Sequence, residues 1–158
     1  WSTGGMAVGP NNMVYVAHSR EARVHDCNGA GRFRALDLKT GVVQWEKDFE
    51  TPLNVAPAVG LLNGKLSVVV NAGMNKESPP FDRKRKFMIM AKPEFPNDKS
   101  TVVVFDADSG DRLLSYEVME NYGISGKERT PTDSWCFPDL FGTPAIGSDN
   151  TIYVNWSG

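Results

Sequence analysis

Apolar and polar residues alternate over short runs along most of this chain, which is the pattern of half-buried β-strands. The runs are bounded by Gly, Pro, Asn and Asp, the residues that form tight turns. Ten Pro and fifteen Gly also argue against long helices. We therefore predict an all-β protein with almost no helix, in which successive short strands pair antiparallel.

A ten-residue phrase near the start of the chain returns near its end. Residues 7–16 read AVGPNNMVYV and residues 145–154 read AIGSDNTIYV, so Ala, Gly, Asn, Tyr and Val recur at the same offsets. A looser copy occupies residues 57–70. Self-similarity at a spacing of tens of residues is typical of a repeat architecture.

A second phrase alternates with the first. Residues 33–45 read FRALDLKTGVVQW and residues 102–114 read VVVFDADSGDRLL. In each copy, Asp-x-x-Thr/Ser-Gly separates two strand-like runs. Asp bonds to its own backbone two residues on, and Gly accepts a positive φ, so this phrase predicts a tight hairpin turn.

Together the phrases divide the chain into units of four short strands. The strands are predicted near Val8 and at 13–17, 32–38 and 42–49; near 55–59 and at 65–71, 101–107 and 112–118; and near 143–146 and at 151–155. Four-stranded antiparallel units in series are the blades of a β-propeller. We predict that the first two units pack face to face as blades.

The predicted organisation is a partial β-propeller over residues 1–158. It comprises blade one (1–52), blade two (53–119, with an insert at 74–100), a second insert (119–140) and the start of blade three (141–158). A closed propeller has about 4–8 blades. We therefore expect that remaining blades or other protein chains complete the fold.

Residues 35–45, ALDLKTGVVQW, resemble the A-x-D-x-x-T-G-x-x-x-W repeat of the pyrroloquinoline-quinone-type propellers. That superfamily includes quinoprotein alcohol dehydrogenases, an outer-membrane assembly lipoprotein that only binds partners, and the lumenal sensor domain of an unfolded-protein-response kinase. The resemblance covers most of the chain apart from the two inserts. It implies an extracytoplasmic or lumenal location.

The resemblance also assigns structural repeat positions. The second copy keeps Ser109 and has Leu114 where the first has its tryptophan. The repeat positions are Asp37, Gly41, Trp45, Asp106 and Gly110. Trp45 is expected to be buried against a neighbouring blade and to support the Asp37–Gly41 turn.

Composition narrows the classes of partner. Seventeen basic and nineteen acidic residues give a net charge of −2, so no general attraction to nucleic acid is expected. No apolar run approaches ~18 residues, which excludes direct membrane insertion by a helix. The two cysteines, Cys27 and Cys136, fall in units that are not neighbours, so we expect no disulfide between them.

Strand order predicts where binding residues gather. Because successive strands reverse, the short turns lie at one end of the sheets and the connections 20–31, 74–100 and 119–142 lie at the other. The cysteines and the 74–100 insert are thus expected opposite Gly41, Gly64, Gly110 and Asn150. Long connections on a rigid scaffold are where binding residues concentrate.

Two features of these connections are candidate partner-binding sites. The 74–100 insert has seven basic and four acidic residues, a net +3, and contains the run Arg83, Lys84, Arg85, Lys86. The run suits an acidic protein partner or a phosphate-bearing surface, fits a nuclear-localisation signal, or is simply a solvated loop. Trp135 belongs to an aromatic cluster that either lines a central pocket or anchors its loop.

No catalytic, cofactor-binding or metal-binding residue is predicted. The spacing of His18, His25 and Cys27 matches no standard zinc pattern, and there is no G-x-S-x-G motif. Two functions remain: a non-catalytic scaffold for protein–protein interaction, or a fragment of a quinoprotein dehydrogenase that oxidises an alcohol or sugar with pyrroloquinoline quinone (PQQ) and Ca²⁺. The family's pair of adjacent cysteines is absent, and a fold alone confers no chemistry, so the scaffold is favoured.

Overall fold

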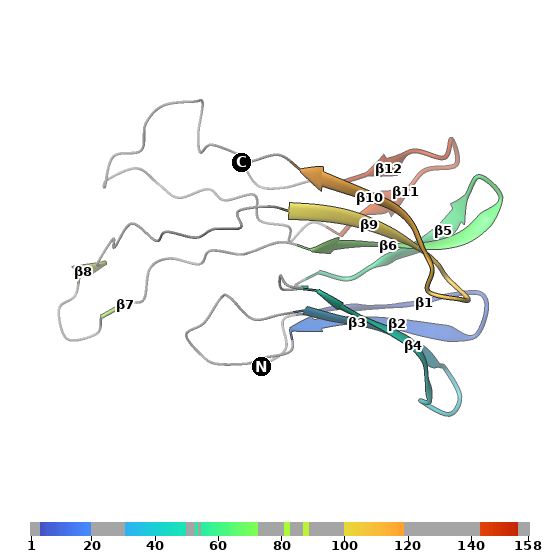
Figure 1. The fold of residues 1–158 in the computed structure, drawn as a ribbon, viewed down its shortest axis with the longest axis horizontal. Helices are drawn as coiled ribbons and strands as arrows, with labels where there is room; N and C mark the ends of the chain where they lie inside the picture. Colours follow the sequence, from blue (N-terminus) through green and yellow to red (C-terminus); the bar gives the residue numbers. More distant parts are fainter. Residues whose placement is uncertain are drawn as a thin grey trace.

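The computed structural model describes residues 4–19, 31–49, 53, 55–72, 81–82, 87–88, 100–118 and 143–154. Over these residues the protein is all-β, contains no helix, and pairs its strands antiparallel (Figure 1). The predictions of an all-β chain and of four-stranded antiparallel sheets are confirmed.

Two four-stranded sheets form the body of the molecule. Sheet one has the order β1 (Met6–Val8), β2 (Met13–Ser19), β3 (Gly31–Asp37) and β4 (Val43–Phe49). Sheet two has the order β5 (Ala58–Leu62), β6 (Lys65–Ala72), β9 (Ser100–Asp106) and β10 (Arg112–Val118). Two hairpins accompany them: β7 (Phe81–Asp82) with β8 (Phe87–Met88), and β11 (Ala145–Ile146) with β12 (Ile152–Tyr153), which we call hairpin three.

Sheet two lies between sheet one and hairpin three (Figure 1). Its strand β6 is buried continuously from Ser67 to Ala72, because both of its faces are covered. Strand β3 alternates instead between buried and half-buried residues, because it is covered on one face. The first strands of the units lie side by side, β1 beside β5 and β5 beside β11.

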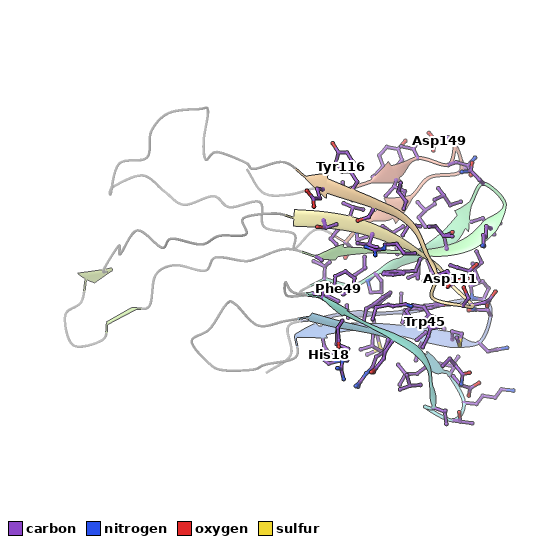
Figure 2. All side chains as sticks on the ribbon, viewed as in Figure 1. His18, Trp45, Phe49, Asp111, Tyr116 and Asp149 are labelled. Atoms are coloured by element: carbon purple, nitrogen blue, oxygen red, sulfur yellow. The ribbon has the colours of Figure 1, made fainter. Side chains whose placement is uncertain are left out.

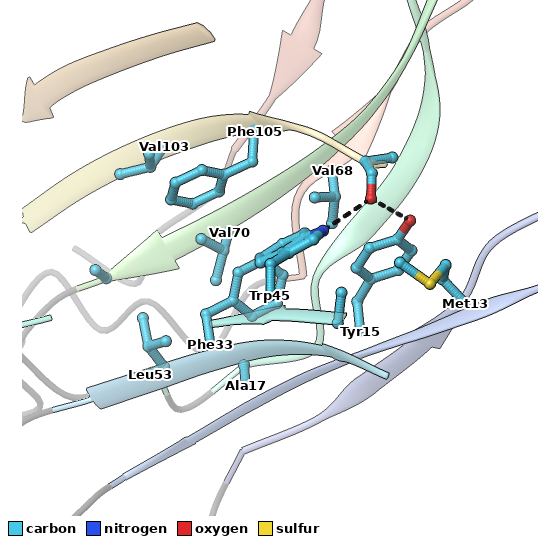
Figure 3. Packing of buried hydrophobic residues seen from close by; sticks show 13 residues of the cluster. Met13, Tyr15, Ala17, Phe33, Trp45, Leu53, Val68, Val70, Val103 and Phe105 are labelled. Atoms are coloured by element: carbon cyan, nitrogen blue, oxygen red, sulfur yellow. Dashed lines mark hydrogen bonds between the residues drawn. The ribbon is translucent and has the colours of Figure 1, made fainter. Parts of the chain in front are cut away.

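Two apolar clusters hold the layers together. The larger lies between the sheets and combines aromatic residues of sheet one with Val68, Val70, Val103 and Phe105 of sheet two (Figure 3). The smaller joins the other face of sheet two, around Val69, Val102 and Val104, to hairpin three. Burial of apolar surface stabilises by about 25 cal/mol per Å² and is the main force holding these layers together.

One strand differs in position from the prediction. Strand β5 was expected near 55–59 and runs from Ala58 to Leu62. The reason is the turn that follows: Asn63 and Gly64 have φ values of 51° and 77°, which is the two-residue turn whose twist matches that of the paired strands. The tight turn lets β5 continue to Leu62.

The two ends of the sheets differ (Figure 1). The short turns between β1 and β2, β3 and β4, β5 and β6, β9 and β10, and β11 and β12 lie at one end, which we call the turn end. The ends of β2, β6 and β10 that lead into longer segments, together with β7 and β8, lie at the other, which we call the connection end. Arg83, Lys84, Arg85, Lys86 and Trp135, and also His25, Cys27 and Cys136, lie outside the described residues.

Candidate functional site

The Asp37 turn is held together by its own side chains. Asp37 Oδ1 accepts hydrogen bonds from the Lys39 amide (3.0 Å), the Thr40 amide (2.8 Å) and the Thr40 hydroxyl (2.8 Å). These donors lower the pKa of Asp37, the Thr40 amide having the largest effect. Gly41 follows with φ of 72° and donates its amide to the Asp37 carbonyl at 2.8 Å. This is the hairpin turn that the sequence predicts.

The Asp106 turn repeats the backbone contacts of this geometry, but its Ser109 hydroxyl donates to Asp111 Oδ2 at 2.8 Å and not to the turn aspartate. Asp106 Oδ1 accepts the Asp108 and Ser109 amides, both at 2.8 Å. Its other oxygen pairs with the Lys65 ammonium at 2.7 Å, a contact that sequence reasoning missed. The Lys65 ammonium, followed by the amide donors, lowers the pKa of Asp106 from 3.8 to about 2.

This pKa shift predicts how stability responds to acid. Because the folded pKa of Asp106 lies below its ordinary value, ionised Asp106 stabilises the fold above pH 3.8, and this contribution is lost as the pH falls to about 2. The melting temperature of Asp106→Asn should therefore fall less than that of the unchanged protein over this interval. Lys65→Met removes the main cause of the shift and should also flatten the curve. An acid transition identical in all three proteins would contradict this assignment.

A single backbone carbonyl in sheet two receives two side chains from sheet one. The Trp45 indole N–H donates to the Ala107 carbonyl at 3.1 Å, and the Tyr15 hydroxyl donates to the same oxygen at 2.9 Å (Figure 3). Trp45 is 9% exposed and Tyr15 is fully buried. A carbonyl oxygen has two lone pairs, so both bonds are satisfied at once.

Gly110 makes room for this contact. It has a φ of 73°, and a Cβ placed on it would lie only 2.6 Å from Trp45 Cδ2. The Trp45 ring also meets Phe33 edge-on, with centroids 5.5 Å apart, and Phe105 at 6.0 Å. The structure thus places Trp45 of sheet one against Gly110 of sheet two, while Gly41 has open space at the equivalent point.

A polar contact borders the buried aromatic residues at the turn end. Asn11 donates to Asp108 Oδ1 of sheet two at 2.7 Å and to the Tyr15 hydroxyl at 2.9 Å. Sequence reasoning missed the roles of Asn11 and Tyr15. The signal was present, because both stand in the phrase that returns at residues 145–154.

The face of sheet one turned away from sheet two is half apolar and half charged. Near β1 it presents Met6 and Val8, which are 68% and 59% exposed. Near β4, Arg32 binds Asp48 through two nitrogens at 2.7 and 3.2 Å, and Arg34 binds Glu46 at 3.1 Å. Such exposed pairs contribute little to stability, because solvent screens them. We call this surface the outer face of sheet one.

Metal-ligating side chains do not gather among the described residues. No group of three or more His, Cys, Asp or Glu among them is placed to hold a metal ion. In the described part of the chain no helix is long and apolar enough to cross a membrane. What the arrangement does provide is a set of layered sheets with side chains that recognise backbone on the next layer.

No family model matches the chain, and no curated protein sequence resembles it significantly.

Proposed function

We propose that this chain is a segment of a β-propeller of the pyrroloquinoline-quinone repeat type, and that it is a non-catalytic scaffold. Three features support the propeller. Each of the first two units is an up-and-down sheet of four strands. The sheets stack face to face, and the first strands β1, β5 and β11 lie beside one another, as the inner strands of blades do. The Asp-x-x-Thr/Ser-Gly turns recur at one end.

The functional proposal rests on the difference between the turn end and the connection end of the sheets. The described turns at the turn end are short and locked by their own hydrogen bonds. All of the longer segments leave from the connection end (Figure 1). Because loops displayed on a rigid scaffold carry binding residues, the connection end is the proposed docking surface for a protein partner.

The proposed contacts within that surface are the basic run Arg83, Lys84, Arg85 and Lys86, with Trp135. The hairpin of β7 and β8 flanks the basic run on both sides. A run of four cations suits an acidic protein surface, which it would attract over about a Debye length of ~10 Å. Tryptophan is among the residues that contribute most at interfaces.

A photo-crosslinking residue placed in turn at Lys84 and at Trp135, in the protein expressed in cells, tests this proposal. Adducts with another protein are expected from both positions, and replacing the four basic residues by Ser should remove the Lys84 adduct. Ser109 and Asn63, exposed at the turn end, are matched control positions and should give no such adduct.

Equal crosslinking from both ends, or none from either, would contradict the scaffold proposal. So would saturable binding of PQQ with Ca²⁺ accompanied by alcohol-dependent reduction of a dye, because that result assigns the chain to a quinoprotein dehydrogenase.

A further inference from the structure

The outer face of sheet one has a counterpart in sheet two that is fully buried. Strand pairing shows which positions of the two sheets are equivalent. Ala35 and Val104 each stand two residues before the Asp of their turn, and they lie opposite Tyr15 and Val69, respectively. Positions 14, 16 and 36 of sheet one therefore correspond to positions 68, 70 and 105 of sheet two.

The exposure of these equivalent positions differs between the sheets. Val68, Val70 and Phe105 are at most 2% exposed, because sheet one covers them. Val14, Val16 and Leu36 are only half-buried. The outer face of sheet one is thus built like a surface that receives another layer.

The exposed face of hairpin three is complementary to the outer face of sheet one. Tyr153 corresponds to Tyr15 in the repeated phrase, and its hydroxyl also bonds to the residue four positions earlier: it donates to Asp149 at 3.3 Å, whereas the Tyr15 hydroxyl accepts from the Asn11 amide at 2.9 Å. A Cβ on Gly147 or on Gly9 would lie 2.9 Å from Cε2 of the neighbouring tyrosine in both cases. Yet Tyr153 is 55% exposed and Tyr15 is fully buried.

The turn of sheet one contains the acceptor that such a tyrosine needs. Leu38 follows Asp37 as Ala107 follows Asp106, and the two residues donate their amides equivalently, to Asn12 at 2.8 Å and to Leu66 at 3.1 Å. The Leu38 carbonyl is therefore the counterpart of the Ala107 carbonyl. Gly41 beside it has the φ of Gly110 and open space around it.

The charges at the two surfaces are complementary. Between sheets one and two, Asn11 donates to Asp108. On hairpin three, Asp149 stands at the position equivalent to Asn11. On sheet one, Lys39 stands at the position equivalent to Asp108. A carboxylate and an ammonium group replace the amide and the carboxylate, so an ion pair takes the place of the hydrogen bond.

From this complementarity we propose that the chain associates with a second copy of itself head to tail. The exposed face of hairpin three in one copy packs on the outer face of sheet one in the next, around Val8, Val14 and Val16. The Tyr153 hydroxyl exchanges its bond to Asp149 for one to the Leu38 carbonyl, and Asp149 pairs with Lys39. Contacts of this kind join different surfaces of the two copies and build rings or open chains. This inference goes beyond the proposed partner binding, because it uses the sheet faces and not the connection end.

Sedimentation velocity over a range of concentrations tests the proposal through a compensating pair of substitutions. Lys39→Asp, which copies the residue at the equivalent position of sheet two, sets two carboxylates against each other and should weaken association about tenfold. Adding Asp149→Asn to Lys39→Asp should restore association, because it recreates the Asn11–Asp108 pair seen between sheets one and two.

Two further variants separate association from folding. Val8→Glu puts a charge in the apolar contact and should abolish association, while its exposure in the single chain leaves the melting temperature unchanged. Arg112→Glu, exposed on β10, is the control and should associate normally.

A chain that stays monomeric at millimolar concentration, or an assembly indifferent to Lys39→Asp and Val8→Glu, overturns the proposal. Association that is lost only when the basic run of residues 83–86 is replaced also overturns it. That last result would leave the connection end as the binding surface, so the two proposals fail separately.

Discussion

Truncation of Trp45 to Ala is expected to lower the free energy of unfolding by about 3–5 kcal/mol. The substitution removes a buried ring that touches Phe33 and Phe105, and it removes the indole donor to the Ala107 carbonyl. Urea denaturation followed by circular dichroism measures the change.

Two variants serve as controls for Trp45→Ala. Trp45→Phe keeps a ring and loses the donor, so it should cost less than the truncation. Tyr116→Ala removes an aromatic residue that is 62% exposed on β10 (Figure 2), and it should change stability by less than about 0.5 kcal/mol. A Trp45→Ala protein as stable as Tyr116→Ala would refute the role given to Trp45 between the sheets.

Gly110→Ala is expected to destabilise the protein by about 1–3 kcal/mol more than Gly41→Ala. Both glycines have almost the same φ, 73° and 72°, so each substitution carries the same backbone strain of about 1–2 kcal/mol. Only at Gly110 does the new methyl group collide with Trp45. The same urea titrations give both values, and equal costs would contradict the close packing.

A double-mutant cycle makes this comparison sharper. With Trp45→Ala already present, the collision at Gly110 is absent, and Gly110→Ala should then cost no more than Gly41→Ala. A cost that persists in this background would locate the strain in the backbone instead of in the contact with the ring.

The strands and turns could be predicted from the sequence because the interactions that form them are local. The alternation of residues 32–38 shows that one face of β3 is buried, and Asp37, Thr40 and Gly41 form their turn without help from distant residues. The end of β5 was misplaced, because the positive φ of both Asn63 and Gly64 shortened the expected turn.

The contacts between the layers were harder to predict from the sequence. Trp45 and Tyr15 meet the Ala107 carbonyl across 62 and 92 residues of chain, and side-chain periodicity does not specify which carbonyl a donor reaches. Lys65 and Asp106 lie on adjacent strands, so their pairing required the register of β6 against β9. The partner-binding roles of Arg83–Lys86 and Trp135 stay predictions, because these residues lie outside the described ranges.

The acceptor shared by Trp45 and Tyr15 belongs to the main chain, and this affects how the repeat tolerates change. A substitution at residue 107 alters the side chain and leaves the carbonyl in place. Leu38 and Ala107 hold the same place in their turns with side chains of different size. Leu38 is 47% exposed, whereas Ala107 is fully buried between the layers, so only small side chains suit residue 107. Within that limit, no substitution there removes the acceptor that aligns the layers.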